Sequence, residues 1–113
     1  MLPKKNRLRT QGDFKGVFHG SLRARSGSFQ LMCQKNNTPN ARFGFVVPLS
    51  VSKKAVRRNK LRRQLHEIVW VVFFPKISGY DCVIRAYPGA DGLKYQDIEK
   101  YILEMFRKVG IFS

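Results

Sequence analysis

Acidic residues are scarce in this chain, and their scarcity argues against one class of enzyme. Its 113 residues include only seven Asp and Glu, against 22 Lys and Arg. The seven are scattered along the sequence: Asp13, Glu67, Asp81, Asp91, Asp97, Glu99 and Glu104. A metal-dependent nuclease needs carboxylates that converge on its cations, and no such spacing is present. We therefore expect no metal site and no catalytic residue in the protein itself.

Cysteine and histidine are rare as well, which argues against disulfides and nucleophilic catalysis. Cys33 and Cys82 stand alone within apolar, strand-like segments, so we expect two buried free thiols. The only histidines, His19 and His66, belong to no recognisable Ser/His/Asp or Cys/His set. We interpret both as surface residues beside RNA, with a general acid–base pair as the alternative. A glycine-rich phosphate loop is also missing, and we expect no cofactor on the protein.

No apolar run in the sequence is long enough to cross a membrane. The longest extends from Ile68 to Phe74, whereas a membrane-spanning helix needs about 20 residues. The first residues, Met1 to Arg7, are not followed by the apolar stretch of a signal peptide. We therefore expect a cytoplasmic protein without a membrane partner.

Positive charge is what the chain has in excess. Its formal net charge is +15, and self-repulsion of that size is tolerated most easily when the partner is a phosphate backbone. A hydrophobic content of 43%, with nine Phe, is enough for one modest core. We predict a single RNA-binding domain over residues 1–113, in which the basic, aperiodic residues 1–9 form a flexible arm.

Hydrophobic periodicity predicts an α+β fold. Residues 29–34 and 42–47 alternate as strands do, and we expect them to pair as an antiparallel hairpin. The basic stretch 21–27 is interpreted as a loop. A further strand is expected at 80–87, and helices are expected at 11–19, about 53–72 and 95–108. The architecture is a single αβ sandwich, with a sheet of about four strands packed with three helices in the order α-β-β-(β)-α-β-α.

The densest positive charge lies on the expected helix from 53 to 72. Residues 53–63 carry seven basic side chains. At 100° per residue, an apolar seam of Leu61, Leu65, Ile68 and Val72 faces the core, and Lys54 lies near it. The polar residues form two flanks, with Arg58, Asn59, Arg62 and His66 on one side and Lys53, Arg57, Lys60 and Arg63 on the other. This helix is therefore suited to contact two polyanionic surfaces, and a merely solvated face is the alternative.

Phe14 and Phe18 lie one turn apart on the first expected helix. If that helix packs at the edge of the sheet, both rings and the outward strand residues Gln30 and Met32 form a shallow cleft. Unpaired bases stack on aromatic rings with little regard to sequence. The alternative for both rings is ordinary core packing.

Several segments, taken in order, resemble the bacterial ribonuclease P protein subunit. They include Asp13-Phe14, Arg42-Phe43-Gly44, Ser50 to Lys54, and Ala55 to Arg63, of which the Arg-Asn-containing helix is the specific part. The resemblance continues to residue 107 and so covers nearly the whole chain. It implies an αβ sandwich with a left-handed crossover between parallel strands, against the general rule for such connections.

The resemblance also implies a function. The family's protein binds a catalytic RNA, which carries the chemistry with its magnesium ions, and helps it remove the 5′ leader of precursor tRNA. The residues implied to face the catalytic RNA are Lys53, Lys54, Arg57, Lys60 and Arg63. Those implied to face the leader are Phe14, Phe18, Gln30, Met32, Arg58, Asn59, Arg62 and His66. The alternative is a ribosomal or other structural RNA-binding protein without a processing role.

Three positions depart from the family's pattern. Lys60 replaces an arginine and so lacks its planar fork, and Met32 stands where an aromatic residue is common. His66 stands where another arginine is frequent, which predicts a charge that depends on pH. We expect a monomer, with the apolar stretch Val69 to Phe74 as the route to any self-association.

Overall fold

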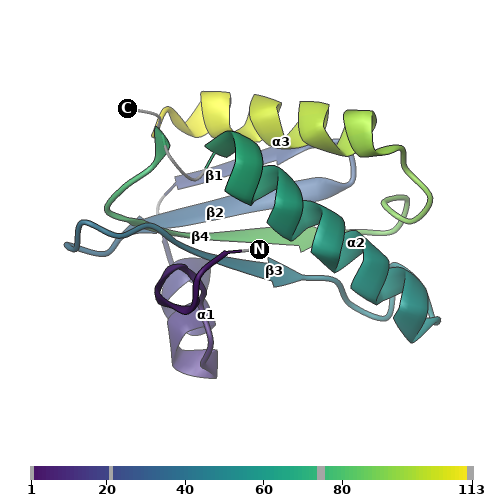
Figure 1. Ribbon diagram of the computed structural model, residues 1–113, viewed down its shortest axis with the longest axis horizontal. Helices are drawn as coiled ribbons and strands as arrows, with labels where there is room; N and C mark the ends of the chain where they lie inside the picture. The colour runs from purple at the N-terminus through teal and green to yellow at the C-terminus, as the bar shows by residue number, and fades with distance from the viewer. Residues whose placement is uncertain (1, 21, 74–75, 112–113) are drawn as a thin grey trace.

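The computed structural model describes residues 2–20, 22–73 and 76–111. One mixed sheet has the strand order β1-β2-β4-β3, with helices on both of its faces (Figure 1). Its strands are β1 (Leu22–Ser26), β2 (Phe29–Lys35), β3 (Arg42–Val46) and β4 (Tyr80–Ala86). The helices are α1 (Gln11–Phe18), α2 (Ala55–Ile68) and α3 (Tyr95–Val109). The predicted α+β class, with four strands and three helices in that order, is confirmed.

The two faces of the sheet differ in their cover. We call inner the face on which α2 and α3 pack, and outer the face on which α1 lies (Figure 1). The inner face carries the main core, whose fully buried members include Phe29, Leu31, Leu65 and Ile102. The outer face carries a smaller buried cluster under α1, made of Leu8, Val17, Met32 and Val83. The outer face is therefore only partly covered.

The connection from β3 through α2 to β4 has unusual handedness. The two strands are parallel neighbours, so α2 forms a crossover between them. In Figure 1 α2 passes in front of the sheet, both strands point to the right, and β4 lies above β3. That arrangement makes the crossover left-handed, as the resemblance implied and against the usual rule.

The predicted hairpin between 29–34 and 42–47 is wrong. Strand β2 instead pairs antiparallel with β1 and β4, with Cys33 opposite Cys82. Strand β3 lies on the far side of β4 and runs parallel to it. The reason lies in β4, where the run Asp81 to Ile84 is buried on both faces. A strand without a solvated face takes an interior position of the sheet and separates β2 from β3.

The predicted loop at 21–27 is also wrong, because residues 22–26 form β1. Ala24 and Ser26 point to the inner face and are buried, while Arg23 and Arg25 are exposed. The alternation of a strand is present, but its buried members are small and one is polar. A search for large apolar residues therefore misses it.

Residues 2–9 are not a flexible arm. Leu2, Asn6 and Leu8 are buried, and the short 3-10 helix η1 (Lys4–Asn6) leaves its lysines in solvent. The backbone N–H of Leu8 donates to the carbonyl of Phe43 at 2.9 Å, and Asn6 Nδ2 donates to the carbonyl of Ala41 at 2.7 Å. The segment therefore lines the free edge of β3. Charged residues between its buried ones concealed this packing in the sequence.

The end of the long helix differs from its predicted form. Helix α2 stops at Ile68 and continues as one π turn, η2 (Val69–Phe73). A π turn shifts the helical register. Leu61, Leu65 and Ile68 are buried as predicted, but Val69 and Phe73 take the next core positions, and Val72 is only half-buried. The proposed self-association stretch thus retains a single exposed large apolar side chain, Val71, among its described residues. Phe74 lies outside the described residues.

Both cysteines lie in the interior of the sheet. Cys33 and Cys82 are buried and free, with their sulfur atoms 3.1 Å apart on neighbouring strands. Burial raises the pKa of the Cys82 thiol, which therefore stays protonated at neutral pH. In the described part of the chain, no helix combines the length and apolar character that a membrane crossing requires.

Candidate nucleic-acid interface

A groove lies on the outer face, where α1 meets the sheet. Its volume is about 570 Å³. It is lined by Arg9, Thr10, Gln11, Phe14, Lys15, Phe18, Val46 and Arg85. The rings of Phe14 and Phe18 are half-buried, with centroids 6.5 Å apart. The groove thus combines aromatic rings with three basic side chains, Arg9, Lys15 and Arg85, a combination typical of single-strand binding.

The two strand residues expected in this cleft lie differently. Met32 is only 3% exposed and belongs to the buried cluster under α1. It therefore supports the aromatic rings from below and offers no surface to a base, which corrects its expected role. Gln30 is half-buried, and its Oε1 accepts a hydrogen bond from the hydroxyl of Tyr87 at 2.8 Å.

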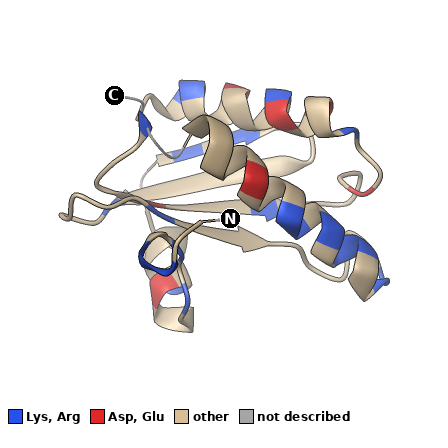
Figure 2. Cartoon of the chain, in the orientation of Figure 1, with Lys and Arg blue, Asp and Glu red and all other residues tan. Residues whose placement is uncertain are grey.

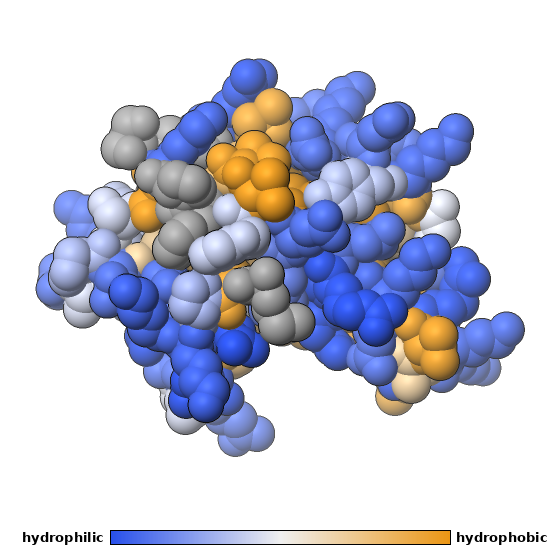
Figure 3. Space-filling view, viewed as in Figure 1, coloured by the Kyte–Doolittle hydropathy of each residue, from blue (hydrophilic) through white to orange (hydrophobic). Residues whose placement is uncertain are grey.

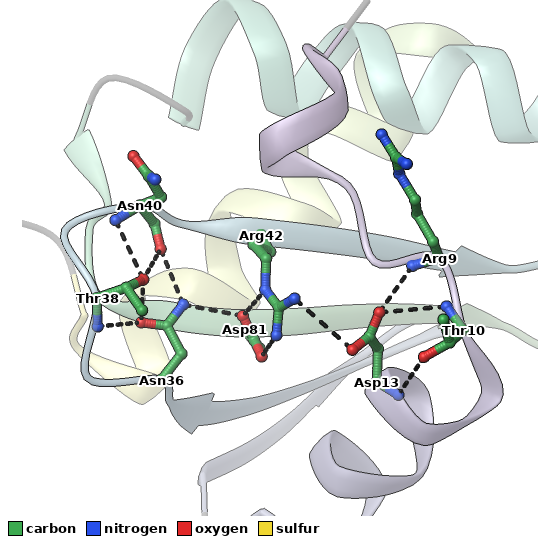
Figure 4. Close-up of polar contacts among 8 residues, drawn as sticks. All are labelled: Arg9, Thr10, Asp13, Asn36, Thr38, Asn40, Arg42 and Asp81. Atoms are coloured by element: carbon green, nitrogen blue, oxygen red, sulfur yellow. Dashed lines mark hydrogen bonds and ion pairs between the residues drawn. The ribbon is translucent and has the colours of Figure 1, made fainter.

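Polar contacts tie α1 to the sheet (Figure 4). Thr10 and Asp13 form a capping box at the start of α1. Arg42 on β3 binds Asp81 on β4 through two hydrogen bonds of 2.8 and 2.6 Å. Its Nη1 also lies 3.6 Å from Oδ1 of Asp13. Arg42 therefore connects the cap of α1 to two strands.

The same contacts explain the charge state of Asp13. Hydrogen bonds from the backbone N–H groups of Arg9 and Thr10, together with the charge of Arg42, lower the pKa of Asp13. Asp13 and Asp81 are thus engaged in structural contacts. The described residues contain no group of three or more His, Cys, Asp and Glu side chains placed to hold a metal ion.

Lysine and arginine crowd the N-terminal part of α2 and the turn before it (Figure 2). Lys53, Lys54, Lys60 and Arg63 are exposed. Figure 3 shows the surface in the same orientation, which is mostly hydrophilic with small separate apolar patches. The exposed large apolar side chains of the described residues are Leu49, Val56 and Val71. This face is therefore better suited to a polyanion than to an apolar partner.

The two flanks of α2 face different neighbours. Arg57 lies beside the loop before α3, where its Nε donates to both carboxylate oxygens of Asp91 at 2.8 Å. This ion pair raises the pKa of Arg57, and the carboxylate of Asp91 offsets part of the arginine's positive charge. The opposite flank lies against β3, where the His66 ring packs 4.3 Å from the Phe45 ring. Arg57 and His66 therefore lie on opposite flanks, as the helical angles predicted, but the angles did not reveal that Arg57 has a partner within the protein.

Polar residues of the β3 flank make short-range contacts within their own segment. Arg58 Nη1 donates to the carbonyl of Ser52 at 2.9 Å, and Arg62 Nη1 donates to Asn59 Oδ1 at 2.8 Å. Both arginines are half-buried, and Asn59 is exposed. These contacts restrain the guanidinium groups, while each leaves further N–H donors for an acceptor outside the protein.

His66 does not carry the charge that its position suggested. Burial, followed by the positive charges of Arg7 and Arg62, lowers the pKa of His66 to about 4. Its buried Nδ1 has no hydrogen-bond partner among the described residues. The imidazole is therefore neutral at physiological pH and acts as a ring packed on Phe45.

Several residues of the groove were missed in the sequence. Arg9 belongs to a segment predicted to be flexible, and Lys15 and Val46 carried no distinct signal. Arg85 occupies an outward position on β4, paired with Gln30 and Val46 in the sheet register. Strand alternation would have revealed its direction, but its neighbours depend on the order of the strands.

Comparisons with known proteins match this chain to one family. Residues 2–110 match the family model described as Ribonuclease P. The ribonuclease P protein component of Synechocystis sp. is 33% identical over 114 residues, covering 99% of this chain and 91% of the relative. That of Pseudanabaena sp. is 35% identical over 112 residues, covering 98% and 97%.

Solved structures show the same fold. The RNase P protein from Thermotoga maritima matches with a TM-score of 0.80 at 26% identity, covering 91% of this chain and 96% of that one. The RNase P protein from Staphylococcus aureus matches with a TM-score of 0.86 at 20% identity, covering 96% and 98%.

Proposed function

This chain belongs to the ribonuclease P protein family, and on that premise we propose that it is the protein subunit of a tRNA-processing ribonucleoprotein. It binds the catalytic RNA and the 5′ leader of precursor tRNA. The RNA and its magnesium ions carry out the cleavage, and the protein contributes substrate binding. We place it in the cytoplasm as a monomer.

The groove between α1 and the sheet is the observation that supports leader binding. Phe14 and Phe18 provide rings on which unpaired bases stack, while Arg9, Lys15 and Arg85 provide charge for the phosphates. Stacking and phosphate contacts do not read sequence. A site of this kind suits leaders whose sequences differ from one precursor to the next.

The flanks of α2 supply the remaining contacts. Lys53, Lys54, Lys60 and Arg63 are exposed and bind phosphates of the catalytic RNA. Arg57 joins them when a phosphate replaces or shares its contact with Asp91. Arg58, Asn59 and Arg62 lie on the β3 flank and bind the leader. His66 contributes a neutral ring beside them and no charge.

Reconstitution with a ribonuclease P RNA at low magnesium tests the function. Adding the protein should increase the rate of precursor cleavage, because the protein binds the leader and screens phosphate repulsion in the assembled complex. Cleavage that stays unchanged while the RNA is bound would identify a structural RNA-binding protein instead. Cleavage by the protein alone would contradict the assignment of catalysis to RNA.

A further inference from the structure

An arginine–tyrosine cluster, formed by Arg25, Arg85 and Tyr87, lies beside the groove on the outer face. The guanidinium carbon of Arg25 is 4.3 Å from the centroid of the Tyr87 ring, and that of Arg85 is 5.4 Å from it. Tyr87 follows β4 directly, and its backbone N–H donates to the carbonyl of Ser28 at 2.8 Å. Its hydroxyl donates to Gln30. The ring is thus held at both ends and restrains two cations.

No ion pair neutralises the charge of this cluster among the described residues. Over residues 2–20, 22–73 and 76–111, no carboxylate lies within 4 Å of a nitrogen of Arg25 or Arg85. Arg25 is exposed, and the buried Nε of Arg85 has no acceptor. A cation–π contact fixes a guanidinium through its plane and leaves its N–H edge available. Because the Nε of Arg85 is buried, a phosphate reaches this half-buried residue through its Nη groups, as it does at exposed Arg25.

The cluster is continuous with the groove. Arg85 lines the groove and also contacts Tyr87. The sheet register places Arg25 opposite Gln30, Gln30 opposite Arg85, and Arg85 beside Val46. These residues form one row across β1, β2, β4 and β3, and its Val46 end lies in the groove. The neighbouring Arg23 binds the carbonyl of Phe18 through its Nη2, which joins β1 to the end of α1.

We propose that a single-stranded leader continues from the groove along this row. Arg85 at the edge of the groove and Arg25 beyond it, both held by Tyr87, bind successive phosphates of the leader. The inference rests on the proposed function and extends it, because it names a second segment of the leader that the protein binds. Recognition of this segment is independent of sequence, since only the phosphate backbone is bound.

The experiment measures the affinity of the assembled ribonucleoprotein for precursor tRNAs whose leaders lengthen one nucleotide at a time. With the wild-type protein, affinity should rise as the leader fills the groove and rise again when it reaches Arg25. The Arg25→Gln variant should abolish only the second increase, a loss of about tenfold for long leaders. Its salt dependence should flatten by about 0.7 of a slope unit for long leaders alone.

Two further variants refine the test. Tyr87→Leu removes the ring that restrains both arginines and should reproduce the effect of Arg25→Gln, whereas Tyr87→Phe keeps the ring and should retain most of the second increase. Arg107→Gln on α3 removes an equal charge from an exposed position away from the outer face and serves as the matched control. Thermal unfolding of each variant checks that the fold is intact.

The outcomes separate this inference from the proposed function. If the wild-type affinity rises with leader length and the Arg25→Gln curve coincides with it, the second segment does not exist. Equal weakening of short-leader and long-leader precursors, or weaker assembly with the catalytic RNA, also overturns it. If the wild-type affinity does not depend on the leader at all, the proposed function itself fails.

Discussion

Gly44 and Phe14 are matched across the contact between β3 and α1, because a Cβ atom on Gly44 would lie 2.4 Å from Cε1 of Phe14. Any side chain at position 44 would therefore occupy space that the aromatic ring fills. Helix α1, which Arg42 contacts at its cap, carries the ring over the sheet, and the absence of a side chain at Gly44 leaves space for it. The shape of the groove thus depends on a residue that does not itself line it.

Replacing Gly44 by alanine should displace Phe14 and deform the groove. We expect a loss of stability of about 1–3 kcal/mol from overpacking. Affinity for precursor tRNA should fall, while assembly with the catalytic RNA stays close to wild type. Urea unfolding and leader-dependent binding measure the two effects. Gly16→Ala is the matched control, because its Cβ would meet only Gln34 Oε1 at 3.4 Å. Unchanged leader binding in Gly44→Ala would show that the position of Phe14 is unimportant.

Neighbouring arginines on α2 should have different partners. Arg62→Ala should weaken binding of precursor more than of mature tRNA by the assembled complex, since Arg62 lies on the β3 flank. Arg63→Ala should mainly weaken assembly with the catalytic RNA, and the salt dependence of assembly should flatten by about 0.7–0.9 of a slope unit. Each variant serves as the control for the other. If the two variants weakened precursor binding equally and also weakened assembly equally, the division into flanks would be refuted.

Asp91 should limit the affinity of the protein for the catalytic RNA, because its carboxylate competes with phosphates for Arg57. Asp91→Asn should raise that affinity by about twofold to fivefold at low salt, the range expected from an exposed ion pair. The gain should shrink as salt increases. Asp97→Asn removes the same charge from the first turn of α3 and controls for the change in net charge. Weaker assembly of Asp91→Asn would indicate instead that the ion pair positions Arg57 for RNA.

His66 should make stability depend on pH below neutrality. The pKa of His66 is about 4 in the folded protein, below its ordinary value of about 6.5, so the unfolded chain binds more protons between these values. The contribution of neutral His66 is therefore complete above pH 6.5 and is lost as the pH falls toward 4. Urea unfolding across this range, compared with His66→Phe, measures it. The variant keeps a ring against Phe45 and should show a smaller slope.

Leader binding should not depend on the protonation of His66 near neutral pH. Between pH 6 and 8 the imidazole of His66 stays neutral. Leader affinity should therefore show the same dependence on pH in the wild-type protein and in His66→Phe. An NMR titration of the His66 imidazole gives the pKa directly. A titration midpoint near 6.5 would show that burial and the neighbouring arginines do not lower the pKa of His66.

Elements with strong local signals were predicted correctly. The Thr10–Asp13 capping box defines the start of α1, and the apolar periodicity of 95–109 defines α3, because both depend on residues within a few positions of each other. The division of α2 into two flanks is similarly local. Strand β1 was missed because its buried residues are small, and the N-terminal segment was missed because its buried residues are isolated among charges.

Pairing of distant segments could not be predicted in the same way. The antiparallel hairpin was expected from proximity in sequence, but the doubly buried β4 separates β2 from β3. Arg85 could be placed on an outward position, yet its neighbours Gln30 and Val46 follow only from the observed strand order. The π turn at η2, which exchanges Val72 for Phe73 in the core, likewise depends on packing against α3.

Composition and helical periodicity are sufficient to predict the class of partner and the main binding helix. A net charge of +15 and seven basic residues within 53–63 require only counting and helical angles, and both predict RNA. Which side chains are free to bind RNA, and which neighbours they have, follows only from the tertiary structure. Arg57 is paired, His66 is neutral, Met32 is covered, and Arg25 meets Tyr87, because desolvation and pairing depend on atoms brought together from distant parts of the chain.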